Sequence, residues 1–308
     1  MTDDRSFYVR PAKQDDLINI TELIIACDID EWGEPDFSKE DLQEIWDDIS
    51  LDTNTFIIQT FDYSIVGYGF IEEISEGRID CYGFVAPNQK GLGVGSLLVK
   101  AFHDRASYYI DKYKKLGVKH TFNIIIPAKN KKAVCLMKEN GFSFSRLHSK
   151  MSIDIDTLNA YKIPETIKLK LFDAQTDWEL LFDLYNHCFK DTREHREQTL
   201  DMWMTEKTSP GYDKTLWYIA YLNDEPSGFI MCKKSPEAIW IDLLGVINTR
   251  RNLGVAKTLL NQIFQDCYTI NFPKVQLMVD ANSLTNANLL YEKVGMKAIY
   301  QIAVFSKN

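Results

Sequence analysis

The sequence predicts two α+β domains, each built on a mixed, mostly antiparallel sheet flanked by helices. Three observations carry this prediction. The length of 308 residues, with 45% hydrophobic composition, suits about two domains. The same order of strand and helix patterns occurs in residues 1–160 and in residues 161–308, which we take as the two domains. Two similar glycine-containing segments, "NQKGLGVGSLL" and "TRRNLGVAKTLL", each join an apolar strand to an apolar helix.

The first half alternates strand and helix patterns in a definite order. Apolar spacing of three and four predicts helices, whereas short apolar or alternating runs predict strands. The expected strands cover residues 6–11, 55–61, 65–74, 79–86, 121–127 and 143–155, and the expected helices cover residues 12–27, 37–46, 95–113 and 131–140. Ser38 is a suitable helix N-cap, and Gly141 suits the left-handed position that closes a helix.

The second half repeats this order after a break near Pro164. The expected strands cover residues 166–172, 216–222, 227–234, 239–247, 274–280 and 297–307, and the expected helices cover residues 177–189, 196–204, 255–267 and 286–294. Lys90 and Arg251 are 161 positions apart, as are Gly95 and Ala256 and also Cys27 and Cys188. A constant spacing of this kind indicates an internal repeat.

Composition excludes several classes of protein. The net charge of −9 disfavours a nucleic-acid partner, and no apolar run approaches the roughly 20 residues of a membrane span. The acidic, polar N-terminus does not resemble a signal peptide. Six separated cysteines and five histidines without ligand spacing predict free thiols in the cytoplasm and no metal site. A homodimer is left open.

The two glycine-containing segments have the properties of anion-binding loops. The first N–H groups of a helix have no internal partner, and small residues let a phosphate approach them. We call residues 88–95 the N-terminal glycine loop and residues 249–256 the C-terminal glycine loop. The residues expected to hold the anion are Lys90, Gly91, Leu92, Gly93, Val94 and Gly95, and Arg251, Asn252, Leu253, Gly254, Val255 and Ala256. Neither segment satisfies the P-loop or dinucleotide fingerprint.

These loops resemble the GNAT superfamily of acyl-CoA-dependent N-acyltransferases. The family signature is Arg or Gln, two residues, Gly, one residue, then Gly or Ala, which "VINTRRNLGVA" satisfies and "VAPNQKGLGVG" satisfies apart from Lys90. The resemblance, including a tandem layout similar to mycothiol synthase, implies that acetyl-CoA is the co-substrate. It also implies that the pantetheine arm lies where the fourth and fifth strands splay. Backbone near Leu244 and Val246, or Val85 in the first half, would then hold the acyl carbonyl.

A downstream family signature distinguishes the two halves. "DANSLTNANLLYEKVGM" places Tyr291 at the family's tyrosine position and has Asn282 near the usual asparagine, whereas "NKKAVCLMKENGF" has Asn130 and Met137. The resemblance implies that Tyr291 protonates the departing thiolate, which methionine cannot do. An ordinary half-buried aromatic is the structural alternative. The second domain is therefore expected to be catalytic, and the first to bind cofactor only or to be inactive.

Asp242 is the candidate general base for the attacking amine. An acid inside the apolar strand "IWIDLLGV" is unexpected, and strand alternation would place it on one face with Leu244 and Val246. A carboxylate paired within the fold explains the residue equally well. The leading hypothesis is transfer of acetyl from acetyl-CoA to the primary amine of a small molecule. The alternatives are a non-enzymatic acyl-CoA-binding module and acetylation of peptide or protein N-termini.

Overall fold

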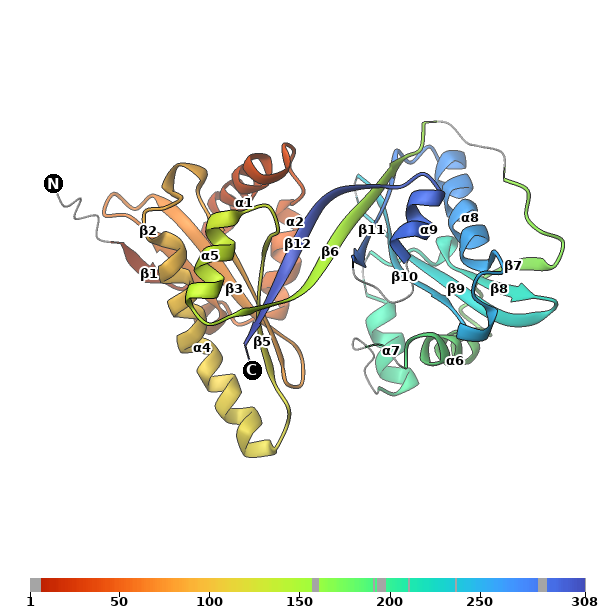
Figure 1. Cartoon of the computed structure of the whole chain (residues 1–308), viewed down its shortest axis with the longest axis horizontal. Coiled ribbons are helices and arrows are strands. Elements are labelled where there is room, and N and C mark those ends of the chain that lie inside the picture. The colour runs from red at the N-terminus through yellow and green to blue at the C-terminus, as the bar shows by residue number, and fades with distance from the viewer. Residues whose placement is uncertain are drawn as a thin grey trace. The chain divides into compact units, whose positions relative to one another are not determined.

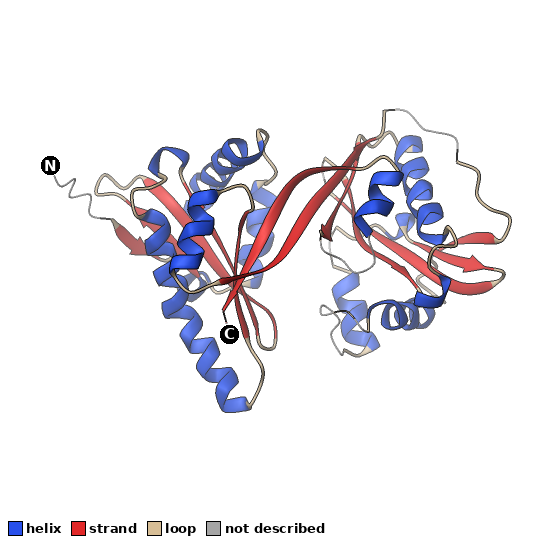
Figure 2. Cartoon of the chain, viewed as in Figure 1, coloured by secondary structure: helices blue, strands red, loops and turns tan. Residues whose placement is uncertain are grey.

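The computed structural model describes residues 7–156, 161–190, 192, 198–209, 211–235, 237–281 and 287–307. It divides into two compact units. Unit 1 contains Met1–Ser149, Asp280–Asn282 and Tyr300–Asn308, and unit 2 contains Lys150–Val279 and Ser283–Ile299. Each unit has helices on both faces of a mixed, mostly antiparallel sheet (Figure 2). This confirms the predicted fold class. Among the helices in the described part of the chain, none has the length and apolar character of a membrane span.

Unit 1 follows the predicted order of elements. Its strands are β1 (Tyr8–Arg10), β2 (Thr55–Gln59), β3 (Ile65–Ser75), β4 (Arg78–Val85) and β5 (Thr121–Pro127), and β6 (Ser143–Asp154) begins in it. Its α-helices are α1 (Leu17–Trp32), α2 (Lys39–Asp48), α3 (Leu51–Asn54), α4 (Val94–Leu116) and α5 (Lys131–Glu139), with short 3-10 helices at Gln14–Asp16 and Pro87–Gln89. Strands β1 to β4 pair antiparallel in sequence order, and β4 pairs with β5 in parallel.

Unit 2 repeats the plan. Its strands are β7 (Ile167–Leu171), β8 (Tyr218–Leu222), β9 (Glu225–Lys234), β10 (Ile239–Val246) and β11 (Lys274–Asp280), and β12 (Lys297–Lys307) begins in it. Its α-helices are α6 (Trp178–Phe189), α7 (Leu200–Lys207), α8 (Val255–Thr269) and α9 (Ala287–Lys293), with 3-10 helices at Lys214–Leu216 and Asn248–Arg250. The pairing again changes from antiparallel to parallel between β10 and β11.

The final strands of the two halves are exchanged. In unit 1, the strand beside β5 is β12, whose residues from Ile302 to Lys307 pair antiparallel with Pro127 to Phe122. In Figure 1 the blue β12 accordingly lies against strands of the red-to-yellow unit. In unit 2, the strand beside β11 is β6. The expected boundary at residues 160 and 161 therefore does not coincide with these units. The hydrogen-bonding edge of β5 or of β11 can be paired by the final strand of either half.

Two apolar layers in each unit hold the helices to the sheet. In unit 1, α4 packs on the face that carries Ile79 and Cys81, and α1 and α2 pack on the face that carries Tyr68 and Phe70. In unit 2, α8 and α9 cover one face, and α6 and α7 cover the other. Ser38 caps α2 as predicted, since its Oγ accepts a hydrogen bond from the backbone N–H of Asp41.

Candidate functional site

The strands that precede each glycine loop separate from their parallel neighbours. β10 pairs with β11 only at Ile239–Val275 and Trp240–Gln276, although β10 continues to Val246 along β9. In unit 1 the corresponding parallel pairing of β4 and β5 ends at Tyr82–Ile125. Alternate N–H groups on the unpaired edge of such a strand have no partner in the ladder. They are available to a carbonyl oxygen, which is the role expected for the backbone near Leu244 and Val246.

The two glycine loops adopt the same backbone conformation. Gly91 and Gly93 have φ of 91° each, and the residues 161 positions later, Asn252 and Gly254, have φ of 62° and 89°. Asn tolerates the left-handed region better than other residues with a side chain, so it can replace glycine at position 252. Each loop leads into a helix, α4 or α8, without a side-chain cap at the glycine N-cap. In both helices, the N-cap glycine therefore provides no side-chain acceptor for the first backbone N–H groups.

Tyr291 lies in the core of unit 2. It is 8% exposed and belongs to the cluster that contains Ile241, Val255 and Val279 from β10, α8 and β11. Leu244 and Val246 pack against the same cluster. Burial raises the pKa of Tyr291 to about 12, so its hydroxyl keeps a proton at neutral pH. Its counterpart Met137 is also buried, within the core of unit 1.

Asp242 does not occupy the face predicted for it. The register of β10 against β9 shifts between Ile241 and Leu243, and this bulge interrupts the alternation that would have placed Asp242 with Leu244 and Val246. The carboxylate Oδ2 instead accepts hydrogen bonds from Lys207 Nζ of α7, at 3.0 Å, and from the Tyr212 hydroxyl, at 2.8 Å. This is the paired carboxylate that the sequence left as the alternative.

Lys207 is itself unusual because it is 6% exposed. Burial lowers the pKa of this ammonium, but the charge of Asp242 and the contacts with Tyr212 outweigh burial and leave the pKa above its ordinary value. The Lys207 ammonium is therefore charged at neutral pH. Both hydrogen bonds end on Oδ2 of Asp242, so this oxygen is already engaged within the fold.

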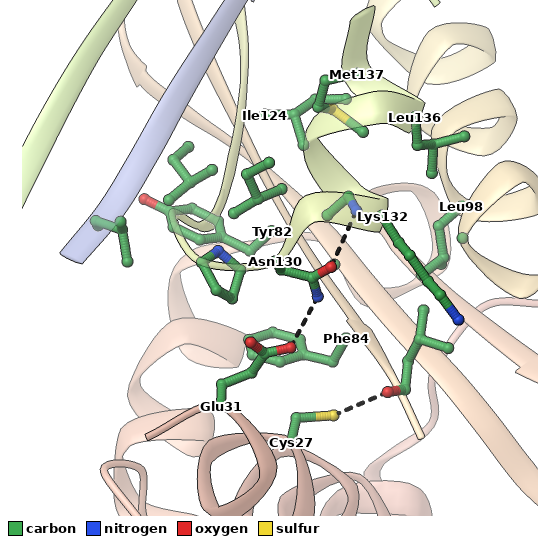
Figure 3. Close-up of a pocket in the computed structure, with 18 of the residues that line it drawn as sticks. Cys27, Glu31, Tyr82, Phe84, Leu98, Ile124, Asn130, Lys132, Leu136 and Met137 are labelled. Atoms are coloured by element: carbon green, nitrogen blue, oxygen red, sulfur yellow. Dashed lines mark hydrogen bonds between the residues drawn. The ribbon is translucent and has the colours of Figure 1, made fainter. Parts of the chain in front are cut away.

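The cations of the two glycine loops have different partners. Arg251 Nε donates to the carbonyl of Val246 at 3.2 Å, and no other hydrogen bond or ion pair joins its guanidinium to the described residues. Lys90 Nζ instead contacts Asp30 Oδ2 at 2.6 Å and also the carboxylate of Glu31. Asn130 completes this network: its Nδ2 donates to Glu31 at 2.8 Å while its Oδ1 accepts from the backbone N–H of Ala133. Figure 3 shows the contact between Asn130 and Glu31.

A cavity of about 940 Å³ opens beside the N-terminal glycine loop in unit 1. It runs from Gly91 and Gly93 past Asn130 and Met137 to the aromatic and acidic side chains of α1, β3 and β4. Figure 3 shows Leu98, Leu136, Ile124 and Met137 along one part of it and Tyr82, Phe84 and Glu31 along another. Val85 also lines the cavity, and its carbonyl accepts a hydrogen bond from Cys27 at 3.3 Å. Burial raises the pKa of Cys27 to about 12, so this thiol is not a nucleophile at neutral pH.

Sequence reasoning missed three residues of this cavity. Glu72 follows Phe70 in the apolar run "GYGFIEEI", and an acid in such a strand is the same signal that identified Asp242. Glu31 carries no local signal, because its role depends on Lys90 from another element. Tyr300 comes from β12 and reaches this cavity only through the strand exchange.

Two further expectations concern binding residues and metals. Asn282 lies outside the described residues. In the described part of the chain, no group of three or more His, Cys, Asp or Glu side chains is arranged to hold a metal ion.

This chain is similar to known proteins in sequence and in fold. Residues 178–296 match the Acetyltransferase (GNAT) family. The whole chain is similar to a GCN5-related N-acetyltransferase from Sphaerobacter thermophilus, with 26% identity and a TM-score of 0.87 over 98% of this chain and 95% of that one. No curated protein matches the sequence.

Two further solved structures share the fold. A tandem GNAT protein from the clavulanic acid biosynthesis pathway has 11% identity and a TM-score of 0.70, covering 98% of each chain. A GCN5-related glucosamine N-acetyltransferase region of a fungal multi-domain β-N-acetylglucosaminidase has 15% identity and a TM-score of 0.70, covering 99% of this chain and 38% of that one.

Proposed function

Because this chain is a GNAT-type acyltransferase with a tandem arrangement of two GNAT-like units, we propose that it transfers acetyl from acetyl-CoA to the primary amine of a small molecule and that unit 2 catalyses the transfer. The observation that carries the assignment is the combination, in unit 2, of an uncapped glycine loop, a cation without a carboxylate contact among the described residues, and Tyr291. In unit 1 the counterpart of Arg251 is Lys90, which is bound to carboxylates, and the counterpart of Tyr291 is Met137.

Each group of unit 2 has a defined part in this proposal. The N–H groups around Gly254 and the Arg251 guanidinium bind the pyrophosphate. Unpaired N–H groups of β10 hold the acyl carbonyl and stabilise its developing oxyanion. The amine nitrogen bonds to the carbonyl carbon, the carbon–sulfur bond breaks, and Tyr291 gives a proton to the sulfur. Asp242 is paired with Lys207 and takes no part in the transfer, and the proton of the amine passes to water.

The experiment that tests the proposal is a calorimetric titration with acetyl-CoA. We expect one site per chain and a loss of affinity of about tenfold or more in Arg251→Glu, because a charge-assisted contact contributes about 1.5–3 kcal/mol. Lys90→Glu is the matched control and should leave the affinity within about twofold, since Lys90 is already bound to two carboxylates. Equal losses in both variants, or no binding by the unaltered chain, would refute the assignment to unit 2.

A second prediction concerns the carboxylate that neutralises Lys90. Glu31 is 13% exposed at its side chain and stands beside the loop where an anion would bind. Removing its charge in Glu31→Gln leaves Lys90 with one carboxylate partner, Asp30, in place of two. This should raise the affinity of unit 1 for acetyl-CoA, so that the calorimetric stoichiometry increases from one towards two. The exposed Glu34→Gln is the control and should keep one site. A stoichiometry that stays at one in Glu31→Gln would show that the ion pair between Glu31 and Lys90 is not what prevents acetyl-CoA from binding to unit 1.

A further inference from the structure

Glu72 is a carboxyl group in the cavity of unit 1 that has no partner among the described residues. It lines the cavity from β3, on the same strand face as Phe70. Among the described side chains, none forms a hydrogen bond or ion pair with it. Asp80 lies directly opposite in the register of β3 and β4, so two acids share one position of the sheet. Like charges placed in this way repel each other, and a cation beside Glu72 would remove the repulsion.

The charge of Asp80 is already compensated within the fold. Asp80 is 1% exposed, its carboxylate is held by Arg78 at 2.6 Å, and Asn123 Nδ2 donates to it at 2.7 Å. These contacts fix Asp80 as a structural acid between β4 and β5. Glu72 has no equivalent cation, although burying a charged group without a partner is unfavourable. In the absence of a ligand, protonation of the carboxyl group removes this cost, whereas a positively charged ligand would pair with the ionised carboxylate.

Aromatic rings line this cavity. Trp32 and Tyr300 stack with their centroids 4.2 Å apart, and Phe70 and Tyr82 stack at 4.8 Å. Ring faces attract cations, most strongly where water is excluded. Five acidic side chains and three lysines line the cavity, and one of those lysines, Lys90, is bound to Asp30 and Glu31. The acidic side chains outnumber the lysines, so the lining as a whole favours a cation over an anion.

We propose that the cavity of unit 1 binds a small protonated amine with an apolar or aromatic body, whose ammonium group pairs with Glu72. The aromatic walls hold the body, and the carboxylate selects the charge. This site is separate from the transfer reaction proposed for unit 2 and does not depend on it. It gives unit 1 a ligand that differs in charge from the pyrophosphate expected at its glycine loop.

The binding has a predicted pH dependence. Burial raises the pKa of Glu72 to about 7, with further contributions from the charges of Asp80 on β4 and Asp48 on α2. The titratable side chains of Tyr68 on β3 and of Cys81 and Tyr82 on β4 also interact with Glu72, and burial raises the pKa of each of the three. These three groups therefore stay neutral between pH 6 and 8. Glu72 loses its proton as the pH rises through about 7, so the affinity for a cation should rise about tenfold from pH 6 to pH 8.

Calorimetry with the full chain tests the proposal, with benzylamine as the probe and benzyl alcohol as its neutral analogue. We expect benzylamine to bind at least tenfold more tightly than benzyl alcohol at pH 8. Glu72→Gln should remove both this preference for the amine and the dependence of its affinity on pH. Glu73→Gln is the matched control: Glu73 is the next residue on β3 and is bound to Lys112. It should leave binding within about twofold. Thermal unfolding of both variants establishes that they are folded.

Three outcomes would overturn the proposal. The unaltered chain fails to bind benzylamine, or it binds the alcohol equally well, or folded Glu72→Gln binds the amine as tightly as the unaltered chain. Because the probe is not acetyl-CoA, and Arg251→Glu should leave benzylamine binding unchanged, failure here is distinguishable from failure of the function proposed for unit 2.

Discussion

Replacing Tyr291 with Phe should reduce kcat about a hundredfold or more at neutral pH, while the affinity for acetyl-CoA stays within about twofold. General acid catalysis contributes about 10²–10⁴ to a rate, and phenylalanine keeps the ring that fills the core of unit 2 but has no proton to give. The pKa of Tyr291, about 12, keeps the hydroxyl protonated throughout the neutral range. Initial rates of amine-dependent thiol release, together with a calorimetric titration, measure the two quantities.

The control is Tyr268→Phe, because Tyr268 is 49% exposed on α8 of the same unit. It should retain at least half of the activity. If Tyr291→Phe kept an unchanged kcat, Tyr291 would be a packing residue and the leaving thiolate would take its proton from elsewhere. If no amine supported thiol release but peptides did, the acceptor would be a peptide N-terminus.

Replacing Phe305 with Ala should destabilise the chain by about 3–5 kcal/mol, the usual cost of removing a buried phenylalanine. Phe305 is 2% exposed, lies opposite Ile124 on β5, and belongs to the core cluster of unit 1. The loss of stability should therefore affect unit 1, although Phe305 is close to the C-terminus. Urea unfolding measures the decrease in the free energy of unfolding, and hydrogen exchange shows whether the amides of β5 lose protection.

Ile299→Ala on the same strand is the control, because Ile299 is 39% exposed. It should cost less than about 1 kcal/mol. A small loss in Phe305→Ala, or faster exchange confined to the strands of unit 2, would contradict the exchange of β12 into the sheet of unit 1.

The local features of the site follow from the sequence. The position of each glycine loop between an apolar strand and an apolar helix can be read from periodicity and from the glycines that left-handed backbone requires. The 161-residue spacing identifies the repeat, and the resemblance identifies Tyr291 against Met137. These features are readable because φ preferences and side-chain periods depend on neighbours along the chain.

The pairings between distant segments are decided only by the tertiary structure. No local pattern indicates that β12 completes unit 1, because the edge of β5 accepts any strand of suitable length and face. Because of the bulge, the side chain of Asp242 does not lie on the face of β10 that strict alternation predicts. The carboxylates of Asp30 and Glu31 compensate the charge of Lys90, which the sequence predicts as part of an anion site. Glu72 can be noticed in the sequence, but its lack of a partner depends on which side chains surround it. The sequence alone thus determined the repeated acyltransferase fold and its candidate acid, while the tertiary structure decided which charges are compensated and which remain for a ligand.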